Sequence, residues 1–319
     1  MKIVFMETDS LGDDVDLSIF ESFGEVVRYA KSDPKENAER IKDADIIVVN
    51  KIPMKEETLC KAENLKLICI TATGTNIVDF AYTNARGIDV RNVKNYSTAS
   101  VVQHTFALLF YVYEKLHFYD TFVKRGDYVL SDIFSVFSNK FHELYGKTWG
   151  IIGLGTIGKG VAKVAEAFGA KVVYYSTSGK NDDPIYERVN FETLLKNSDI
   201  ISIHAPLNEA TRGLIGEAEL KLMKKSAILL NLGRGSIVQE QALADALLQG
   251  EIEAAGLDVL EVEPMVANNP LLKVQDSTKL IITPHIAWAT IEARVRCVEE
   301  VFKNIEAFLK GEERNCVRE

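Results

Sequence analysis

Short runs of β-branched and aliphatic residues alternate with helix-period segments along the whole chain, and this alternation restricts the fold more than any other feature. Chains with this pattern form parallel sheets whose strands are joined by helices. In the N-terminal third, the predicted strands are 3–6, 25–29, 46–49, 67–70 and 88–91. Further along, the predicted strands are 148–152, 171–175, 200–203, 227–231, 254–257 and 280–283. The sequence therefore predicts an α/β protein with two doubly wound parallel-sheet domains.

The segments between these strands have helical periodicity, and they indicate how the chain is divided. The shorter predicted helices are 14–22, 34–41, 55–62 and 77–86 in the first series, and 156–168, 191–197, 217–224 and 239–249 in the second. A helix at 98–115 is too densely apolar for one amphipathic face, so we expect it to be buried. A last helix at 291–309 follows the final strand, and we expect it to pack back on the first domain.

The charge balance excludes several classes of partner. The 319 residues include 37 basic and 46 acidic side chains, a formal net charge of -9. Nucleic acids and anionic membranes bind positively charged protein surfaces, so neither is an expected partner of a chain with this negative charge. Residues 95–113 carry no formal charge but are too polar for a membrane span. Four cysteines without metal-ligand spacing predict reduced thiols, no metal site and a cytoplasmic location.

A glycine motif opens the second series of strands. Gly153, Gly155 and Gly158 follow an apolar strand and begin a helix that ends near Gly169. The first glycine permits a tight turn, the second lets a pyrophosphate approach the backbone, and the third allows close helix–strand packing. The free N–H groups of the helix N-terminus favour phosphates. We therefore predict a dinucleotide site that includes these glycines together with Thr156 and Ile157.

The end of the next strand leaves the choice of cofactor open. An acidic residue is expected there to bind the ribose 2′-OH of NAD. This chain instead has a hydroxyl-rich turn that begins at Ser176 and is followed by Lys180. Either Ser176 contacts the ribose of NAD, or the turn and Lys180 accommodate the 2′-phosphate of NADP. The expected cofactor is NAD, with NADP as the alternative.

Three charged or titratable residues follow successive strands of the second series. Arg234 lies between two glycines after the fourth strand, Glu263 lies beyond the fifth, and His285 ends the sixth. Strand ends of one parallel sheet meet at the same edge, where ligands bind. A planar guanidinium suits a carboxylate or 2-oxo acid, and a carboxylate beside an imidazole favours its charged, proton-donating form. His104 and His117 lie on or beside the long helix, and His142 lies in the aromatic-rich segment 119–145. All three are expected to be packing or surface residues.

Together these segments resemble the D-isomer-specific 2-hydroxyacid dehydrogenase family, and the glycerate dehydrogenase (hydroxypyruvate reductase) branch is the nearest. The segments that carry the resemblance are Gly153–Gly158, Asn231–Gly235, Gly256–Pro264 and Thr283–Trp288. The resemblance covers essentially the whole chain. It implies a flavodoxin-like substrate domain formed by 1–98 plus 290–319, and a Rossmann dinucleotide-binding domain formed by 99–289.

The resemblance also implies roles for individual residues. Arg234 would bind the substrate carboxylate and oxo group, and Glu263 would orient and charge His285, the acid/base. Asp258 would hold the nicotinamide carboxamide. In the first domain, the backbone amides of Thr73 and Gly74 would bind the carboxylate, as exposed amides in a glycine turn favour anions. The remaining residues expected at the cofactor are His204, Pro206 and Leu232.

The expected reaction is hydride transfer between a nicotinamide cofactor and C2 of a small D-2-hydroxy acid or 2-oxo acid, such as glycerate or hydroxypyruvate. The alternative is a non-catalytic dinucleotide-sensing regulator on the same scaffold, because a fold does not determine a function. Residues 119–145 are rich in aromatic residues and lack periodicity, so we expect an irregular packing arm. That arm, the dense apolar helix and the resemblance together predict a homodimer.

Overall fold

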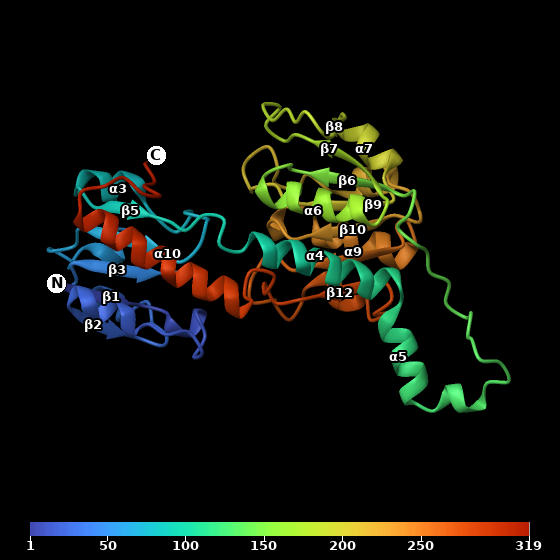
Figure 1. Ribbon diagram of the computed structural model, residues 1–319, viewed down its shortest axis with the longest axis horizontal. Coiled ribbons are helices and arrows are strands. Elements are labelled where there is room, and N and C mark those ends of the chain that lie inside the picture. The colour runs from blue at the N-terminus through green and yellow to red at the C-terminus, as the bar shows by residue number, and fades with distance from the viewer. Residues whose placement is uncertain (319) are drawn as a thin grey trace. The chain divides into compact units, whose positions relative to one another are not determined.

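The computed structural model describes residues 1–318 and divides the chain into two compact units. One unit comprises Met1–Ser97 and the segment from Ala289 onward, and the other comprises Thr98–Trp288 (Figure 1). These limits lie within one residue of the domain limits predicted from the sequence. The first unit is therefore discontinuous in sequence.

The first unit is built on a five-stranded parallel sheet. Its order is β2-β1-β3-β4-β5, the flavodoxin-like arrangement. The bounds are β1 Lys2–Phe5, β2 Glu25–Arg28, β3 Ile46–Val49, β4 Leu67–Ile70 and β5 Asp89–Arg91. Strands β3 and β4 are buried along their whole length, as expected for a parallel sheet covered on both faces. The last helix, α10 (Ile291–Leu309), packs against β4, which confirms the sequence expectation.

The other helices of this unit are shorter than predicted. They are α1 (Asn37–Arg40), α2 (Glu56–Leu59) and α3 (Phe80–Ala85). The helix predicted at 14–22 is wrong: its second half joins a 3₁₀ helix at Ser18–Phe23, and Thr8–Ser10 forms another 3₁₀ turn. Asp16 accounts for the late start, because its carboxylate binds both the amide and the hydroxyl of Ser18.

The second unit contains a seven-stranded parallel sheet of order β12-β11-β10-β9-β6-β7-β8. The bounds are β6 Thr148–Ile152, β7 Lys171–Tyr175, β8 Glu187–Arg188, β9 Ile200–Ile203, β10 Ile228–Asn231, β11 Ala254–Leu257 and β12 Leu280–Ile282. This is the Rossmann order with a seventh strand. The prediction of six strands missed β8, because two exposed charged residues at a sheet edge carry no apolar pattern.

Helices cover both faces of this sheet (Figure 1). On one face lie α4 (Thr98–Tyr113) and α6 (Thr156–Ala167), packed around the fully buried Trp149. On the other lie α7 (Phe191–Asn197), α8 (Glu217–Leu222) and α9 (Glu240–Gln249). The predicted burial of the long helix is confirmed for the side of α4 that packs on the sheet of its own unit, whereas Ala99, Gln103 and Ala107 are exposed.

Residues 116–145 extend away from this sheet (Figure 1). They begin with α5 (Leu116–Lys124) and a 3₁₀ turn at Asp127–Leu130, so the prediction that the arm is irregular from residue 119 is wrong in its first part. Phe134 and Phe137 are 91% and 77% exposed. The described residues therefore supply the expected packing only in part: Tyr119 contacts Phe141 and Leu144 joins the core, whereas Phe134 and Phe137 stay exposed.

Among residues 1–318, no helix combines the length and apolar character that a bilayer-spanning segment needs. The same residues contain no group of three or more His, Cys, Asp or Glu side chains placed to hold a metal ion. All four cysteines are free thiols.

Candidate active site

The glycine turn after β6 has the geometry that a dinucleotide requires. Gly153 has a φ of +93°, and a Cβ there would lie 2.8 Å from the backbone of Ala205. A Cβ on Gly158 would collide with the carbonyl oxygen of Gly153, so this glycine brings α6 against the strand. A Cβ on Gly155 would meet nothing within 4 Å. The open space over Gly155, at the N-terminus of α6 beginning with Thr156 and Ile157, fits a pyrophosphate.

The turn after β7 is held by its own hydrogen bonds. Ser176 is 4% exposed, and its hydroxyl accepts a hydrogen bond from the Asn181 amide at 3.3 Å. The Asn181 side chain in turn donates to the carbonyl of Leu154, beside the glycine turn, at 2.7 Å. Asp183 pairs with Lys159 at 2.8 Å. These contacts show how the turn is anchored, but they do not distinguish the two cofactors.

His204 follows β9 at the edge of the sheet next to the glycine turn. Both ring nitrogens are shielded from solvent and have no hydrogen-bond partner among the described residues. Burial lowers the pKa of His204 to about 3, so the ring is neutral near pH 7. Pro206 is exposed two residues later, whereas Leu232, after β10, belongs to the core.

Arg234 lies in a loop that is fixed at both ends. The buried Asn231 accepts a hydrogen bond from the amide of Gly233 and donates one to the carbonyl of Arg234. One guanidinium nitrogen of Arg234 donates to the carbonyl of Gly233 at 2.8 Å. A Cβ on Gly235 would collide with the backbone of Leu260, so this loop touches the next one directly.

Glu263 and His285 are brought together, as the sequence predicted. Glu263 Oε2 lies 2.7 Å from His285 Nδ1, and Glu263 Oε1 accepts the Leu260 amide at 2.9 Å. His285 adopts a φ of +56°, a left-handed conformation that is costly for a side chain of its type. Its Nε2 has no partner among the described residues and is left for a ligand.

Asp258 holds this strained segment in place. It is 2% exposed. One oxygen accepts the Thr283 hydroxyl at 2.6 Å and the Ile286 amide at 2.9 Å, and the other accepts the Ala287 amide at 2.9 Å. These bonds flank His285 and offset the cost of its conformation. A contact of Asp258 with a carboxamide remains a prediction.

His104 belongs to the same network, which the sequence analysis missed. Its Nε2 lies 3.0 Å from the Thr283 hydroxyl and 3.5 Å from Asp258. Burial lowers its pKa, although Asp258 opposes this effect. Ser100, one turn earlier on α4, donates to the carbonyl of Ala287. Ser100 and His104 lie one helical turn apart, and this spacing was the available signal.

In the first unit, the turn after β4 presents free amides. The Thr73 hydroxyl donates to Val93, and the Thr73 carbonyl accepts the Asn92 side chain at 2.7 Å. Within residues 1–318, the amides of Thr73 and Gly74 donate to no acceptor. Available amides of this kind can bind an anion.

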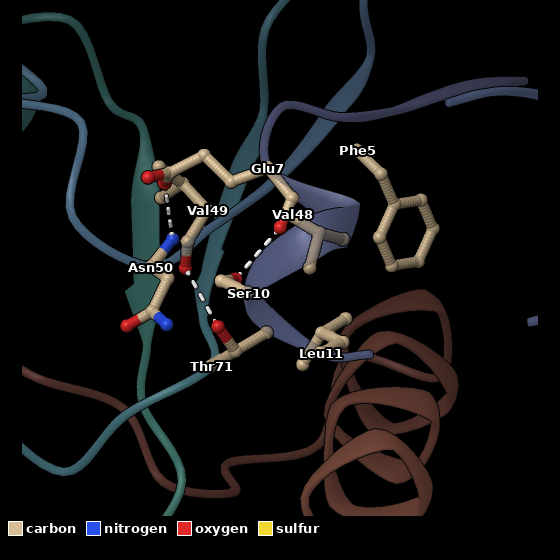
Figure 2. Close-up of a pocket in the computed structure, with 8 residues that line it drawn as sticks. All are labelled: Phe5, Glu7, Ser10, Leu11, Val48, Val49, Asn50 and Thr71. Atoms are coloured by element: carbon tan, nitrogen blue, oxygen red, sulfur yellow. Dashed lines mark hydrogen bonds between the residues drawn. The ribbon is translucent and has the colours of Figure 1, made fainter. Parts of the chain in front are cut away.

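A hollow lies beside this turn, between the ends of β1, β3 and β4 (Figure 2). There Glu7 accepts the amides of Asn50, Lys51 and Ile52 at 2.9, 2.8 and 3.2 Å. The sequence analysis did not single out Glu7, because the contact joins residues more than forty positions apart. Glu7 therefore fixes the loop after β3.

Comparisons with known proteins identify the family of the chain. Residues 106–287 match the family described as D-isomer specific 2-hydroxyacid dehydrogenase, NAD binding domain. A glycerate dehydrogenase of Methylorubrum extorquens is 40% identical, over 99% of this chain and 98% of its own length.

Two solved structures have the same fold along nearly the whole chain. An acyclic imino acid reductase in complex with NADPH and D-Arg has a TM-score of 0.88 and 30% identity, covering 99% of this chain and 100% of the other. A D-lactate dehydrogenase of Aquifex aeolicus, complexed with NAD and lactic acid, has a TM-score of 0.84 and 30% identity over 97% and 96%. The chain belongs to the D-isomer-specific 2-hydroxyacid dehydrogenase family and is an oxidoreductase with a nicotinamide-binding domain.

Proposed function

We propose that this enzyme reversibly reduces a small 2-oxo acid to the D-2-hydroxy acid, with hydroxypyruvate and glycerate as the substrate pair. The observation that carries the proposal is the 2.7 Å contact between Glu263 and His285, which leaves the far ring nitrogen of His285 for a substrate. The similarity to a glycerate dehydrogenase over the full length supports the choice of substrate.

The proton transfer follows from this pair. When bound, a reduced nicotinamide would supply the hydride that reaches C2. His285 donates the proton on Nε2 to the carbonyl oxygen as the C=O bond becomes C–OH, and it takes the proton back in the reverse direction. Glu263 keeps the ring oriented through Nδ1 and stabilises its positive charge.

The remaining residues bind and orient. Arg234, on its fixed loop, binds the carboxylate and the oxo group of the substrate through its planar N–H groups. In the first unit, the amides of Thr73 and Gly74 bind a carboxylate. Asp258 contacts the nicotinamide carboxamide in addition to its anchoring bonds.

The glycine turn holds the cofactor pyrophosphate, and Ser176, His204 and Pro206 lie along the rest of the cofactor. We propose NAD as the preferred cofactor, with Ser176 contacting its ribose. NADP is the alternative, since residues 176–180, directly after β7, contain Lys180 and no carboxylate.

We also propose that the enzyme is a homodimer that acts in the cytoplasm. The exposed apolar side chains of the arm need a partner, and a second copy of the chain supplies one. The free thiols suit a reducing compartment.

The function is tested by assaying hydroxypyruvate, glyoxylate and pyruvate with NADH and with NADPH. We expect turnover with hydroxypyruvate, and a loss of at least about a hundredfold in His285→Gln, the range typical of a general acid. The matched control is His117→Gln, an exposed histidine that stacks on Tyr111 and is expected to leave turnover unchanged.

Two results would contradict the proposal. Activity of His285→Gln within a few-fold of the parent would remove His285 as the acid. Cofactor binding without oxidation by any 2-oxo acid would favour the dinucleotide sensor instead.

A further inference from the structure

The loop that carries Glu263 is packed at its start, where Val259 is buried and Leu260 lies against the core, but it is exposed further along. It joins β11, which ends at Leu257, to a 3₁₀ turn at Pro270–Lys273 and contains no regular structure. Two of its apolar side chains, Val262 and Val266, are 50% and 41% exposed. Apolar burial therefore holds the start of the loop but not its exposed middle, although Glu263 in that middle part must meet His285 accurately.

A buried carboxylate ties the two ends of this loop together. Glu240, the first residue of α9, is 9% exposed. Its Oε1 accepts the amide of Glu261 at 2.7 Å, and its Oε2 accepts the side-chain amide of Asn269 at 2.7 Å. Asn269 is 4% exposed, and its own oxygen accepts the amide of Leu271 at 2.9 Å. In each of these contacts a hydrogen-bond donor faces an acceptor.

The contact near Glu261 lies where the loop also meets the Arg234 loop. Gly235 packs directly on the backbone of Leu260, and the Leu260 amide donates to Glu263. Glu240 thus acts close to both loops. The positive end of α9 stabilises its negative charge, because the carboxylate lies in the first turn.

We infer that Glu240 and Asn269 form a clamp that positions Glu263 against His285. Both are positioning residues, since neither is placed to touch substrate or cofactor. As a step in catalysis, this role rests on the proposed function. A displacement of a catalytic group by about 1 Å lowers the catalytic rate by on the order of a hundredfold.

The test exchanges the carboxylate of Glu240 and the amide of Asn269 between the two positions. Glu240→Gln places a second amide nitrogen against that of Asn269, and Asn269→Asp places two carboxylates together. The double variant restores one donor and one acceptor and keeps the single negative charge. We expect each single variant to lower kcat for hydroxypyruvate about tenfold or more, with the Kd for NADH unchanged. The double variant is expected to recover most of kcat.

Two further measurements separate positioning from stability. The matched control is Glu219→Gln, because Glu219 caps the neighbouring helix α8 through the Gly216 amide but is bonded to no loop of the site. We expect it to affect unfolding and leave kcat unchanged. In a Glu263→Gln background, Glu240→Gln is expected to have no additional effect on kcat, because the two act through one contact.

The hydrogen-exchange rates of the Leu260 and Glu261 amides report whether the clamp is intact, and they do not depend on catalysis. Exchange should be faster in each single variant and return to the parent rate in the double variant. If the parent enzyme reduces no 2-oxo acid, the proposed function fails while the exchange rates still decide the clamp. Unchanged exchange in the single variants, a double variant without recovery, or additive effects with Glu263→Gln would each overturn the inference.

Discussion

The protonation of His204 offers a quantitative test of the structure. Both ring nitrogens are sealed from solvent and have no hydrogen-bond partner within residues 1–318, and burial lowers the pKa of His204 from 6.5 to about 3. In the unfolded chain the ring is exposed and takes up a proton near its ordinary pKa. Between these two values the unfolded state binds more protons, so the folded state loses stability as the pH falls.

The size of the loss in stability follows from the difference between the pKa values of His204 in the unfolded and folded states. Stability from this group is complete above pH 6.5, and each pH unit below that value costs about 1.4 kcal/mol. At pH 5 the loss is about 2 kcal/mol relative to pH 8. His204→Leu removes the titrating ring and an unsatisfied buried polar group, so this variant should be at least as stable at pH 8.

The assay is urea unfolding at pH 8 and pH 5, followed by tryptophan fluorescence. Trp149 and Trp288 both lie in the unit Thr98–Trp288, so the signal reports the unit that contains His204. Other titrating groups are shared by parent and variant, and the difference between them isolates this ring. An equal loss of stability in both proteins would refute the reasoning and show that water or a partner reaches the imidazole.

Three more predictions concern other parts of the second unit. Gly155→Ala should leave the unfolding free energy nearly unchanged, but it should weaken NADH binding about tenfold or more, because the new methyl group projects into open space over the turn. Fluorescence titration measures this binding. Gly153→Ala should instead destabilise the fold by about 1–2 kcal/mol, because its methyl group would meet backbone atoms and the residue has a positive φ. Asp258→Asn should lower the unfolding free energy by about 1–3 kcal/mol in urea, since an amide nitrogen would face N–H donors, and an unchanged midpoint would contradict the anchoring role. Phe134→Ser combined with Phe137→Ser should shift the protein from dimer to monomer by light scattering, and a parent that is already monomeric would exclude the homodimer.

Local patterns in the sequence were sufficient for the architecture. Strands such as Ile46–Val49 and Leu67–Ile70 have the predicted limits, because a strand buried on both faces must be continuously apolar. The contact between Glu263 and His285 was predictable for a related reason, since both follow strands whose ends share one sheet edge.

Contacts between distant segments left no comparable signal. Glu240, Asn269 and Glu7 are ordinary polar residues in the sequence, and their roles depend on partners that only the folded chain brings within reach. His104 looked like a packing residue because its partners, Thr283 and Asp258, are more than 150 positions away.

By itself, therefore, the sequence determined the two α/β units, the approximate limits of most of their strands and the strand ends that carry the candidate catalytic residues. These depend on periodicity and on residues that are close along the chain. The tertiary structure decided which buried polar groups are paired, how His285 is held at positive φ, and why His204 stays neutral. A buried charge or hydrogen-bonding group is stabilised or penalised by whatever surrounds it in space, and that environment is assembled only when the chain folds.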